Sequence, residues 1–301
     1  MSLIKKKKSF KTIGLRIWEI VRFVIIFGLA FLILKPFVNK ILLAFMNPDD
    51  LLDPMVMLIP KHFSVYYWRV AWQGMELSRT LLTSTVLSIA VSLIQMISSA
   101  LIGYGLGRFK FRGRNFFYAM VIIIMLIPPQ AYSIAQYLGF RFFGIGPVTI
   151  NTIDSLIPVF IMAIGGIGMK QGLYIYLFVV FFKGLPKDLE NAAYIDGAGA
   201  FRTFFSVIMP NAVSIIVTVM LFSFAWQWTD LSYPKLYFTS LKVIPTVIGE
   251  IYVRVGLTPD TIGSSIAQNA ACMLLLLPLL VLFIFGQKFI SQSISRTGQA
   301  N

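Results

Sequence analysis

Six separate stretches of the chain are apolar enough and long enough to cross a lipid bilayer. The hydrocarbon core needs about 20 apolar residues of α-helix, and runs near this length occur at 18–46, 77–107, 116–135, 161–183, 207–228 and 267–287. Hydrophobic residues make up 57% of the 301 positions and charged residues only 13%, against about 25% in a soluble domain. One compact core could not bury this much apolar surface. The sequence therefore predicts an all-α, polytopic membrane protein with six transmembrane helices.

Two of these spans contain residues that break helices. Lys35-Pro36 predicts an interruption in the first span. Pro158, Gly165-Gly166 and Lys170 lie upstream in the fourth, so we expect a broken or re-entrant start there. The basic head before the first span also fits a signal peptide, but no small-x-small cleavage site follows it. An uncleaved first span is the better interpretation.

The basic residues indicate how the chain is threaded through the membrane. With a cytoplasmic N-terminus, the inside segments are 1–22, 108–115, 183–206 and 288–301. They hold 16 of the 26 Lys and Arg residues but only four of the 12 Asp and Glu residues. Such an excess is typical of cytoplasmic loops, and it explains the net charge of +14 without a nucleic-acid partner. We expect both termini to be cytoplasmic.

The rest of the composition excludes several kinds of chemistry. A single cysteine, Cys272, cannot form an internal disulfide, and a single histidine, His62, excludes a multi-histidine metal site. The sequence contains neither a GxxxxGK[ST] phosphate-binding loop nor a GxSxG serine elbow. We expect no catalytic residues and no metal site in this chain.

The loop at 183–206 is the segment most informative about function. Pro186 suits the first turn of a helix, and Asp188 and Glu190 then lie where the helix dipole favours acids. Asp196-Gly197 is a turn pair, and an apolar face with helical spacing follows it. The pattern predicts two short helices joined at a bend. On spacing alone, an ordinary amphipathic loop lying on the membrane surface fits equally well.

This loop resembles the EAA loop of permease subunits in binding-protein-dependent ABC importers. That pattern is Glu-Ala-Ala, three residues, Gly, nine residues, then a hydrophobic residue, any residue, Leu and Pro. Ala192, Ala193, Gly197 and Pro210 match it, whereas Asn191 stands at the Glu position. The nearest acid is one residue upstream of that position. The resemblance implies that the ATPase-coupling residues are Leu189, Glu190, Asn191, Ala192, Ala193, Asp196, Gly197 and Ala198.

A second segment narrows the resemblance to the maltose-permease-like class of carbohydrate importers. The run Trp226-Gln-Trp-Thr-Asp230, with Pro234 after it, is similar to a segment that follows the fifth span in sugar permeases. The resemblance covers about residues 77–301. It implies a type I importer permease core with its cytoplasmic coupling loop at 183–206. Residues 1–76 would supply a basic tail, the first span and an extracellular loop.

The same resemblance implies partners and a location. A related second permease, two cytoplasmic ATPase subunits and an extracellular solute-binding protein would complete the transporter in the plasma (inner) membrane of a prokaryote. ATP and Mg would be bound by the ATPase subunits, so this chain would be a non-catalytic subunit with no cofactor of its own. This agrees with the lack of a phosphate-binding loop in the sequence.

Candidate residues for a sugar path lie near the outer ends of the fourth and fifth spans. A sugar needs aromatic platforms for its C–H faces and polar groups for its hydroxyls, which predicts Trp226, Gln227, Trp228, Asp230 and Lys170 as path residues. Anchoring at the headgroup level is the alternative for the tryptophans. Alternative functions are a permease for amino acids, peptides or osmolytes, or a secondary transporter, which typically has more ionisable residues within its spans.

Overall fold

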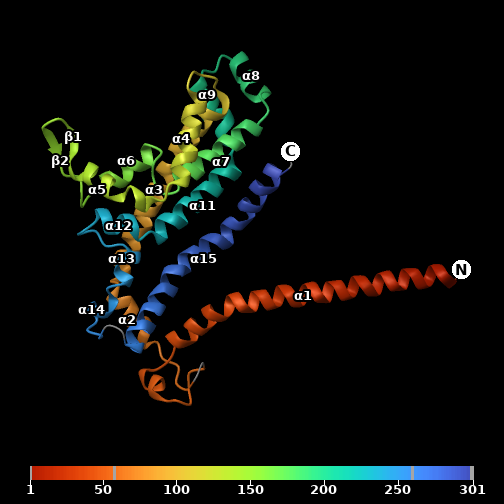
Figure 1. The fold of residues 1–301 in the computed structure, drawn as a ribbon, viewed down its shortest axis with the longest axis vertical. Coiled ribbons are helices and arrows are strands. Elements are labelled where there is room, and N and C mark those ends of the chain that lie inside the picture. Colours follow the sequence, from red (N-terminus) through yellow and green to blue (C-terminus); the bar gives the residue numbers. More distant parts are fainter. Residues whose placement is uncertain (1, 57–58, 259–260, 299–301) are drawn as a thin grey trace. The chain divides into compact units, whose positions relative to one another are not determined.

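The computed structural model describes residues 2–56, 59–258 and 261–298, and these residues are mostly helical (Figure 1). By compactness the chain divides into two units. The first comprises Met1–Gly74 and Ile251–Met273, and the second comprises Met75–Glu250 and Leu274–Asn301. The sequence predicts a functional division into 1–76 and 77–301, and this division stays a prediction.

The first unit contains the N-terminal helix and an irregular segment. Its helices are α1 (Ser2–Ala44), α2 (Tyr66–Gly74), α14 (Ile251–Arg254) and the beginning of α15 (Ile262–Gly298), with a short 3-10 helix at Pro48–Leu52. Apolar side chains of α1 are exposed over 18–38, as expected of a helix that faces lipid. The helix continues through Pro36, so the interruption expected at Lys35-Pro36 is wrong. Pro36 removes only one backbone donor, which transmembrane helices tolerate.

The second unit holds the remaining elements. Its long helices are α3 (Leu77–Arg108), α4 (Arg114–Leu126), α7 (Gln171–Gly184), α11 (Val213–Thr229) and the end of α15. Its short helices are α5 (Ser133–Arg141), α6 (Ile157–Ile164), α8 (Asp188–Ile195), α9 (Ala200–Thr203), α10 (Met209–Asn211), α12 (Ser232–Tyr237) and α13 (Ile244–Ile248). A 3-10 helix, Pro129–Ala131, and a π-helical turn, Phe204–Ile208, complete the helical elements.

The six apolar runs all fall on helices, but three of these helices are interrupted. Trp18–Ala44, Leu77–Arg108 and Ile262–Phe289 are long and apolar enough to span a bilayer. The third run stops at Leu126, before Pro128-Pro129. The fourth is broken between α6 and α7, which confirms the interrupted start predicted for it. The fifth is bent by 82° between Ala200–Asn211 and Val213–Thr229. The chain is therefore a multi-helix membrane protein, whereas the count of six spans stays a prediction.

One element departs from the expectation of an all-α fold. Strands β1 (Phe143–Ile145) and β2 (Val148–Ile150) form an antiparallel hairpin in which Phe143 lies opposite Ile150. Gly146 provides the positive φ of its turn, +64°. Strands of only three residues are too short for an alternating pattern to predict them, and the turn pair Gly146-Pro147 is the signal that the sequence offers.

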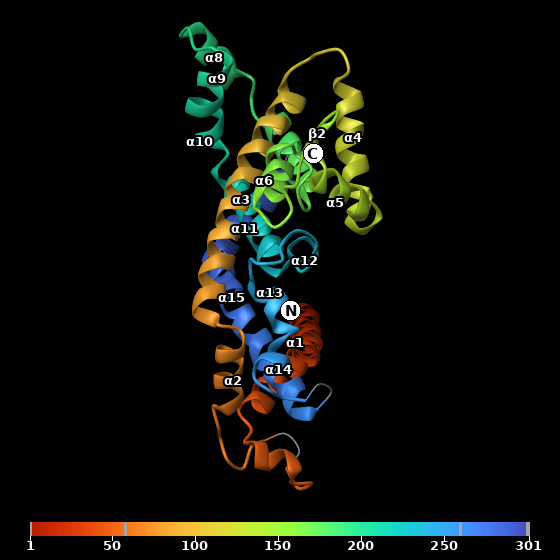
Figure 2. The same ribbon diagram turned by 90° about the vertical axis from the view of Figure 1, so that its left-hand side faces the viewer.

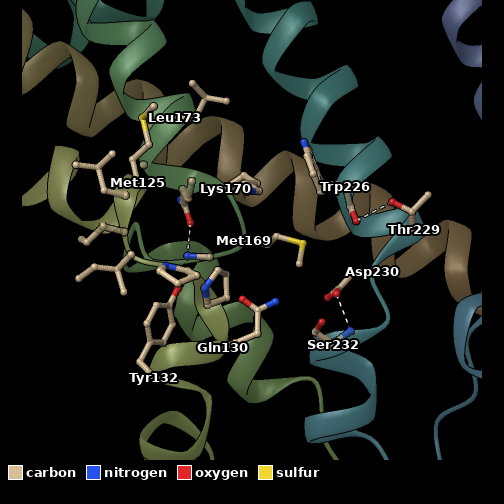
Figure 3. Close-up of a pocket in the computed structure, with 18 of the residues that line it drawn as sticks. Met125, Gln130, Tyr132, Met169, Lys170, Leu173, Trp226, Thr229, Asp230 and Ser232 are labelled. Carbon is tan, nitrogen blue, oxygen red and sulfur yellow. Dashed lines mark hydrogen bonds between the residues drawn. The ribbon is translucent and has the colours of Figure 1, made fainter.

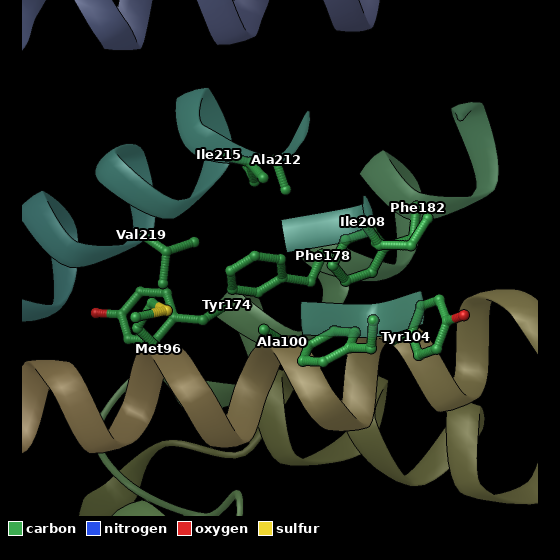
Figure 4. Packing of buried hydrophobic residues seen from close by; sticks show 11 residues of the cluster. Met96, Ala100, Tyr104, Tyr174, Phe178, Phe182, Ile208, Ala212, Ile215 and Val219 are labelled. Carbon is green, nitrogen blue, oxygen red and sulfur yellow. The ribbon is translucent and has the colours of Figure 1, made fainter. Parts of the chain in front are cut away.

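Helices α3, α7 and α11 pack around the main apolar core of the second unit (Figure 4). Phe178 and Phe182 of α7 stack at 5.5 Å between ring centroids and are fully buried. The α3 backbone approaches α7 so closely at Gly103 that an added Cβ would lie 2.5 Å from the Cβ of Phe178. Small residues at such crossings allow helices in lipid to gain van der Waals contact. This core fixes α7 against α3.

Helices α8 and α9 lie together at one end of the second unit, away from α12 and α13 (Figures 1 and 2). Helix α7 begins at Gln171, directly after the break that separates it from α6, and ends at Gly184, shortly before α8. Two regions of the second unit are therefore candidates for function: the α8–α9 loop and the break before α7.

Candidate functional site

Side-chain hydrogen bonds stabilise the irregular segment that separates α6 from α7. Nε2 of Gln171 donates to Oγ of Ser98 and to the carbonyl oxygen of Ala163, both at 2.7 Å. Oε1 of Gln171 accepts from the backbone N–H of Gly168 at 2.8 Å. Gln95 of α3 donates to the carbonyl oxygen of Met169 at 3.4 Å. These bonds satisfy backbone groups that the missing helical turns leave unpaired.

Lys170 occupies a strained position at the end of this break. It caps α7 with φ +56° and ψ +11°, in the left-handed region that non-glycine residues seldom adopt. Its Nζ lies 4.9 Å from the centre of the Trp226 ring of α11, a cation–π distance. The exposed Lys170 side chain therefore reaches from the start of α7 to the end of α11.

A cavity of about 620 Å³ lies at this place (Figure 3). Its wall is formed by 124–130, 132, 168–173, 226 and 229–232. The lining is largely apolar, with polar groups from Gln130, Tyr132, Thr229 and Ser232. A few polar groups set in an apolar wall are typical of small-molecule sites.

Three of the five path residues predicted from the sequence line this cavity: Lys170, Trp226 and Asp230. Gln227 and Trp228 do not. Both are buried, and the Trp228 indole donates to the carbonyl oxygen of Leu275 at 2.9 Å. Successive residues of a helix point in different directions, so α11 directs Trp226 toward the cavity and Gln227 and Trp228 away from it. Sequence reasoning missed Tyr132; the Pro128-Pro129 break, which ends α4 just before it, was the available signal.

Asp230 lines the cavity, but its carboxylate is already hydrogen-bonded to the neighbouring backbone. Only 4% of the residue is exposed, and its carboxylate accepts from the backbone N–H groups of Ser232 at 2.8 Å and Tyr233 at 3.2 Å. Burial raises the pKa of this carboxyl group to about 6, against the lowering effect of those bonds. Asp230 thereby stabilises the start of α12 and has little surface left for a ligand.

The second candidate region is the loop of α8 and α9, and its bend has a defined geometry. Gly197 has φ +77°, which confirms the turn predicted at Asp196-Gly197. The backbone N–H of Ala198 donates to the carbonyl of Ala193 at 2.9 Å, and that of Gly197 donates to the carbonyl of Tyr194 at 3.0 Å. Together these bonds form a Schellman motif, which ends a helix on a left-handed residue.

The loop residues proposed to couple to an ATPase differ in exposure. Ala193 is buried and Leu189, Glu190 and Ala198 are half-buried, so part of α8 faces the protein's own core. The exposed members of the set are Asn191, Ala192, Asp196 and Gly197. Ile195, outside the predicted set, is 86% exposed and extends this open surface. A partner would meet a small, mixed apolar and polar surface here.

An ion pair attaches α8 to the membrane helices. Nε of Arg108, the last residue of α3, donates to both carboxylate oxygens of Glu190 at 2.9 and 3.0 Å. The guanidinium also donates to the carbonyl oxygens of Phe182, Leu185 and Pro186 at 3.0 to 3.3 Å. The side chains are only 6% and 12% exposed. Glu190 is thus paired within its own chain, which leaves little of its carboxylate for an ATPase.

These features define a class: a membrane protein with a cavity among its helices and a helical loop fixed at their other end. A comparison with known protein families gives the same class. Residues 99–296 match the family described as the binding-protein-dependent transport system inner membrane component. The chain belongs to this family. It is a non-catalytic membrane subunit of a transport system that also uses ATPase and solute-binding components.

Individual relatives match along most of the chain. The putative ABC transporter permease protein ORF2 of a Caldicellulosiruptor species is 25% identical over 291 residues, covering 95% of each chain. The arabinooligosaccharides transport system permease protein AraQ of Halalkalibacterium halodurans is 26% identical, covering 87% of this chain and 89% of AraQ. A chain of a bacterial ABC transporter that imports the acidic polysaccharide alginate has a TM-score of 0.70 at 18% identity, with 91% and 96% of the chains covered. This last likeness concerns the fold.

The Arg108–Glu190 pair leads to a prediction about stability. Removing one partner leaves the other charge buried, which typically costs about 3 kcal/mol or more. Glu190→Ala should therefore lower the melting temperature of the purified protein clearly. Asp188→Ala is the matched control, because Asp188 lies in the same first turn of α8 and is exposed; a change within about 0.5 kcal/mol is expected there. Equal melting temperatures for the two variants would show that the pair does not hold α8.

Proposed function

We propose that this chain is one permease half of an ABC importer that moves a sugar or oligosaccharide across the plasma (inner) membrane of a prokaryote. A second, homologous permease would complete the channel, and two cytoplasmic ATPase subunits would bind ATP and Mg. An extracellular solute-binding protein would deliver the substrate. The α8–α9 loop would dock on an ATPase subunit, so that closure of the ATPases on ATP switches the helices between inward-facing and outward-facing states.

The carbohydrate assignment rests on one observation, the Trp226 ring at the cavity wall. Trp226 is 45% exposed although it lies on an apolar helix, and it lies among amide and hydroxyl groups that can bond sugar hydroxyls. Aromatic faces combined with hydrogen-bonding groups suit the alternating apolar and polar surfaces of a sugar. The relative AraQ is named for arabinooligosaccharides, which supports the same class.

The proposed topology has six spans with both termini in the cytoplasm. In it the cavity lies toward the outer ends of α4 and α11, and the α8–α9 loop lies inside. Arg108 ends α3 in contact with that loop. Arg114 begins α4 and donates to the carbonyl oxygens of Leu106 and Gly107, near the end of α3. Positive residues of this kind are expected on the cytoplasmic side. The cavity wall comes from the ends of α4 and α11 and from the break before α7, and in the proposed topology these lie on the side opposite the α8–α9 loop.

Labelling from outside the cell tests this topology. In a Cys272→Ala background, a membrane-impermeant maleimide should label the Thr149→Cys variant, in the exposed β-hairpin, on intact cells. The Asn115→Cys variant, at the exposed start of α4, should react only after the membrane is opened. The reverse pattern would invert the proposed orientation and separate the α8–α9 loop from any cytoplasmic ATPase.

Replacement of Trp226 tests the carbohydrate path. Trp226→Ala should lower saccharide uptake by the complete transporter in proteoliposomes about fivefold, because an aromatic contact contributes about 1 kcal/mol beyond its buried area. Trp226→Phe should restore part of the loss. Phe222→Ala, one turn earlier on α11 and outside the cavity, is the control. Uptake unchanged in Trp226→Ala, or lost equally in both alanine variants, would exclude this ring from the path.

Replacement of Gly197 tests coupling to the ATPase. A β-branched residue at φ +77° is strained by about 1–3 kcal/mol, so Gly197→Val should re-aim α9 relative to α8. The variant should insert at normal levels but lose substrate-stimulated ATP hydrolysis in the assembled complex. Gly199→Ala is the control, because Gly199 has φ −74° and space for a Cβ. Normal stimulated hydrolysis in Gly197→Val would show that the bend transmits nothing.

A further inference from the structure

The two charged groups at the cavity wall differ in how accessible they are. Among the described residues of the lining, the charged side chains are Lys170 and Asp230. Asp230 is nearly inaccessible and already accepts two backbone hydrogen bonds. The contact found for Lys170 is the face of Trp226, not a carboxylate. One exposed ammonium group thus faces a largely apolar cavity.

The position of Lys170 makes this charge costly. It lies at the N-terminal end of α7, where the helix dipole disfavours a cation and favours an anion. Its backbone is also in a conformation that glycine adopts with less strain. The cation at this helix end and the strained backbone both raise the free energy of the protein without a ligand, and such features are typical of functional sites. An anionic ligand beside Nζ would compensate both the cation and the dipole.

We propose that Lys170 and Trp226 form a subsite for a uronate residue, so that the substrate class of this transporter is acidic saccharides. The inference rests on the proposed carbohydrate function of the cavity. The sugar ring would lie on the Trp226 face and the carboxylate at its rim would bind Nζ of Lys170. Polar side chains elsewhere in the wall, such as Gln130 and Thr229, would take hydroxyl groups.

The present contact between the two residues explains how a neutral sugar is disfavoured. Nζ of Lys170 lies over the same ring face that a sugar would use, 4.9 Å from its centre. A neutral sugar displaces the ammonium group and offers it no opposite charge. A uronate displaces it and pairs with it. A sugar phosphate is the other anionic solute. Arginine forks bind phosphate bidentately, and the described lining of this cavity contains one lysine and no arginine, so the single charge of a uronate is the better match.

A matched pair of probes tests the proposal: trigalacturonate and its fully methyl-esterified, uncharged form. Uptake and stimulated ATP hydrolysis are measured on the complete transporter with its binding protein in proteoliposomes. The acid should exceed the ester about tenfold with the unaltered chain. Lys170→Gln should lower this acid-to-ester ratio about tenfold, and Lys170→Arg should restore it. Lys235→Gln, an exposed lysine of α12 outside this cavity, should leave the ratio unchanged.

Because each variant works with the same binding protein, a change in the ratio belongs to the permease. An unchanged ratio in Lys170→Gln, or an equal loss of both probes, would overturn the subsite. Uptake of the ester and of neutral arabinotriose but not of the acid would also overturn it, and would leave the carbohydrate function standing. A response to glycerol phosphate in place of the acid, lost in Lys170→Gln, would replace uronate by phosphate. Uptake of none of these saccharides by a transporter that does take up an amino acid or a peptide would refute the proposed function itself.

Discussion

A helix that stops within a membrane leaves backbone N–H and C=O groups where no water can pair with them, and the second unit depends on how this is solved before α7. Each unpaired group in hydrocarbon costs several kcal/mol. Gln171 solves most of the problem by bonding Gly168 on one side and Ala163 on the other. Ser98 of α3 joins the same network. Because these bonds fix the break, the chain can hold Lys170 at positive φ beside an open cavity.

Helix α7 connects the two candidate sites. Its 14 residues span about 20 Å, from Lys170 at the cavity to the carbonyls of Phe182 and Leu185, which Arg108 binds. Arg108 also holds Glu190, so the end of α7 and the start of α8 share one guanidinium. The tight packing of α7 on α3 at Gly103 makes this a stiff connection. A rotation of α8 by a partner would therefore act on α7 directly.

The sequence predicts the local features of this arrangement better than its long-range contacts. Apolar runs place the helices because bilayer thickness fixes their length, and Asp196-Gly197 places the bend because glycine favours positive φ. Which residues of 226–230 face the cavity depends on the helical phase of α11, and its nearly uniform apolar sequence does not reveal that phase. The Arg108–Glu190 pair joins residues 82 positions apart, and no local sequence pattern predicts it. The strands of hairpin β1–β2 are likewise too short for an alternating pattern to predict them, although Gly146-Pro147 marks their turn.

Two cations lie at opposite ends of α7, and their surroundings compensate their charges to different degrees. Arg108 meets the C-terminal end, where the dipole and the free carbonyls favour a positive charge, and it is almost completely buried and paired. Lys170 stands at the N-terminal end, where the dipole opposes it, and remains exposed above an aromatic ring. The first placement minimises the free energy of the empty protein. The second does not, and the anion proposed to bind beside Lys170 would lower this free energy. Because an importer must bind its substrate and then release it, this position suits a single, unpaired lysine better than a cation already fixed in an ion pair.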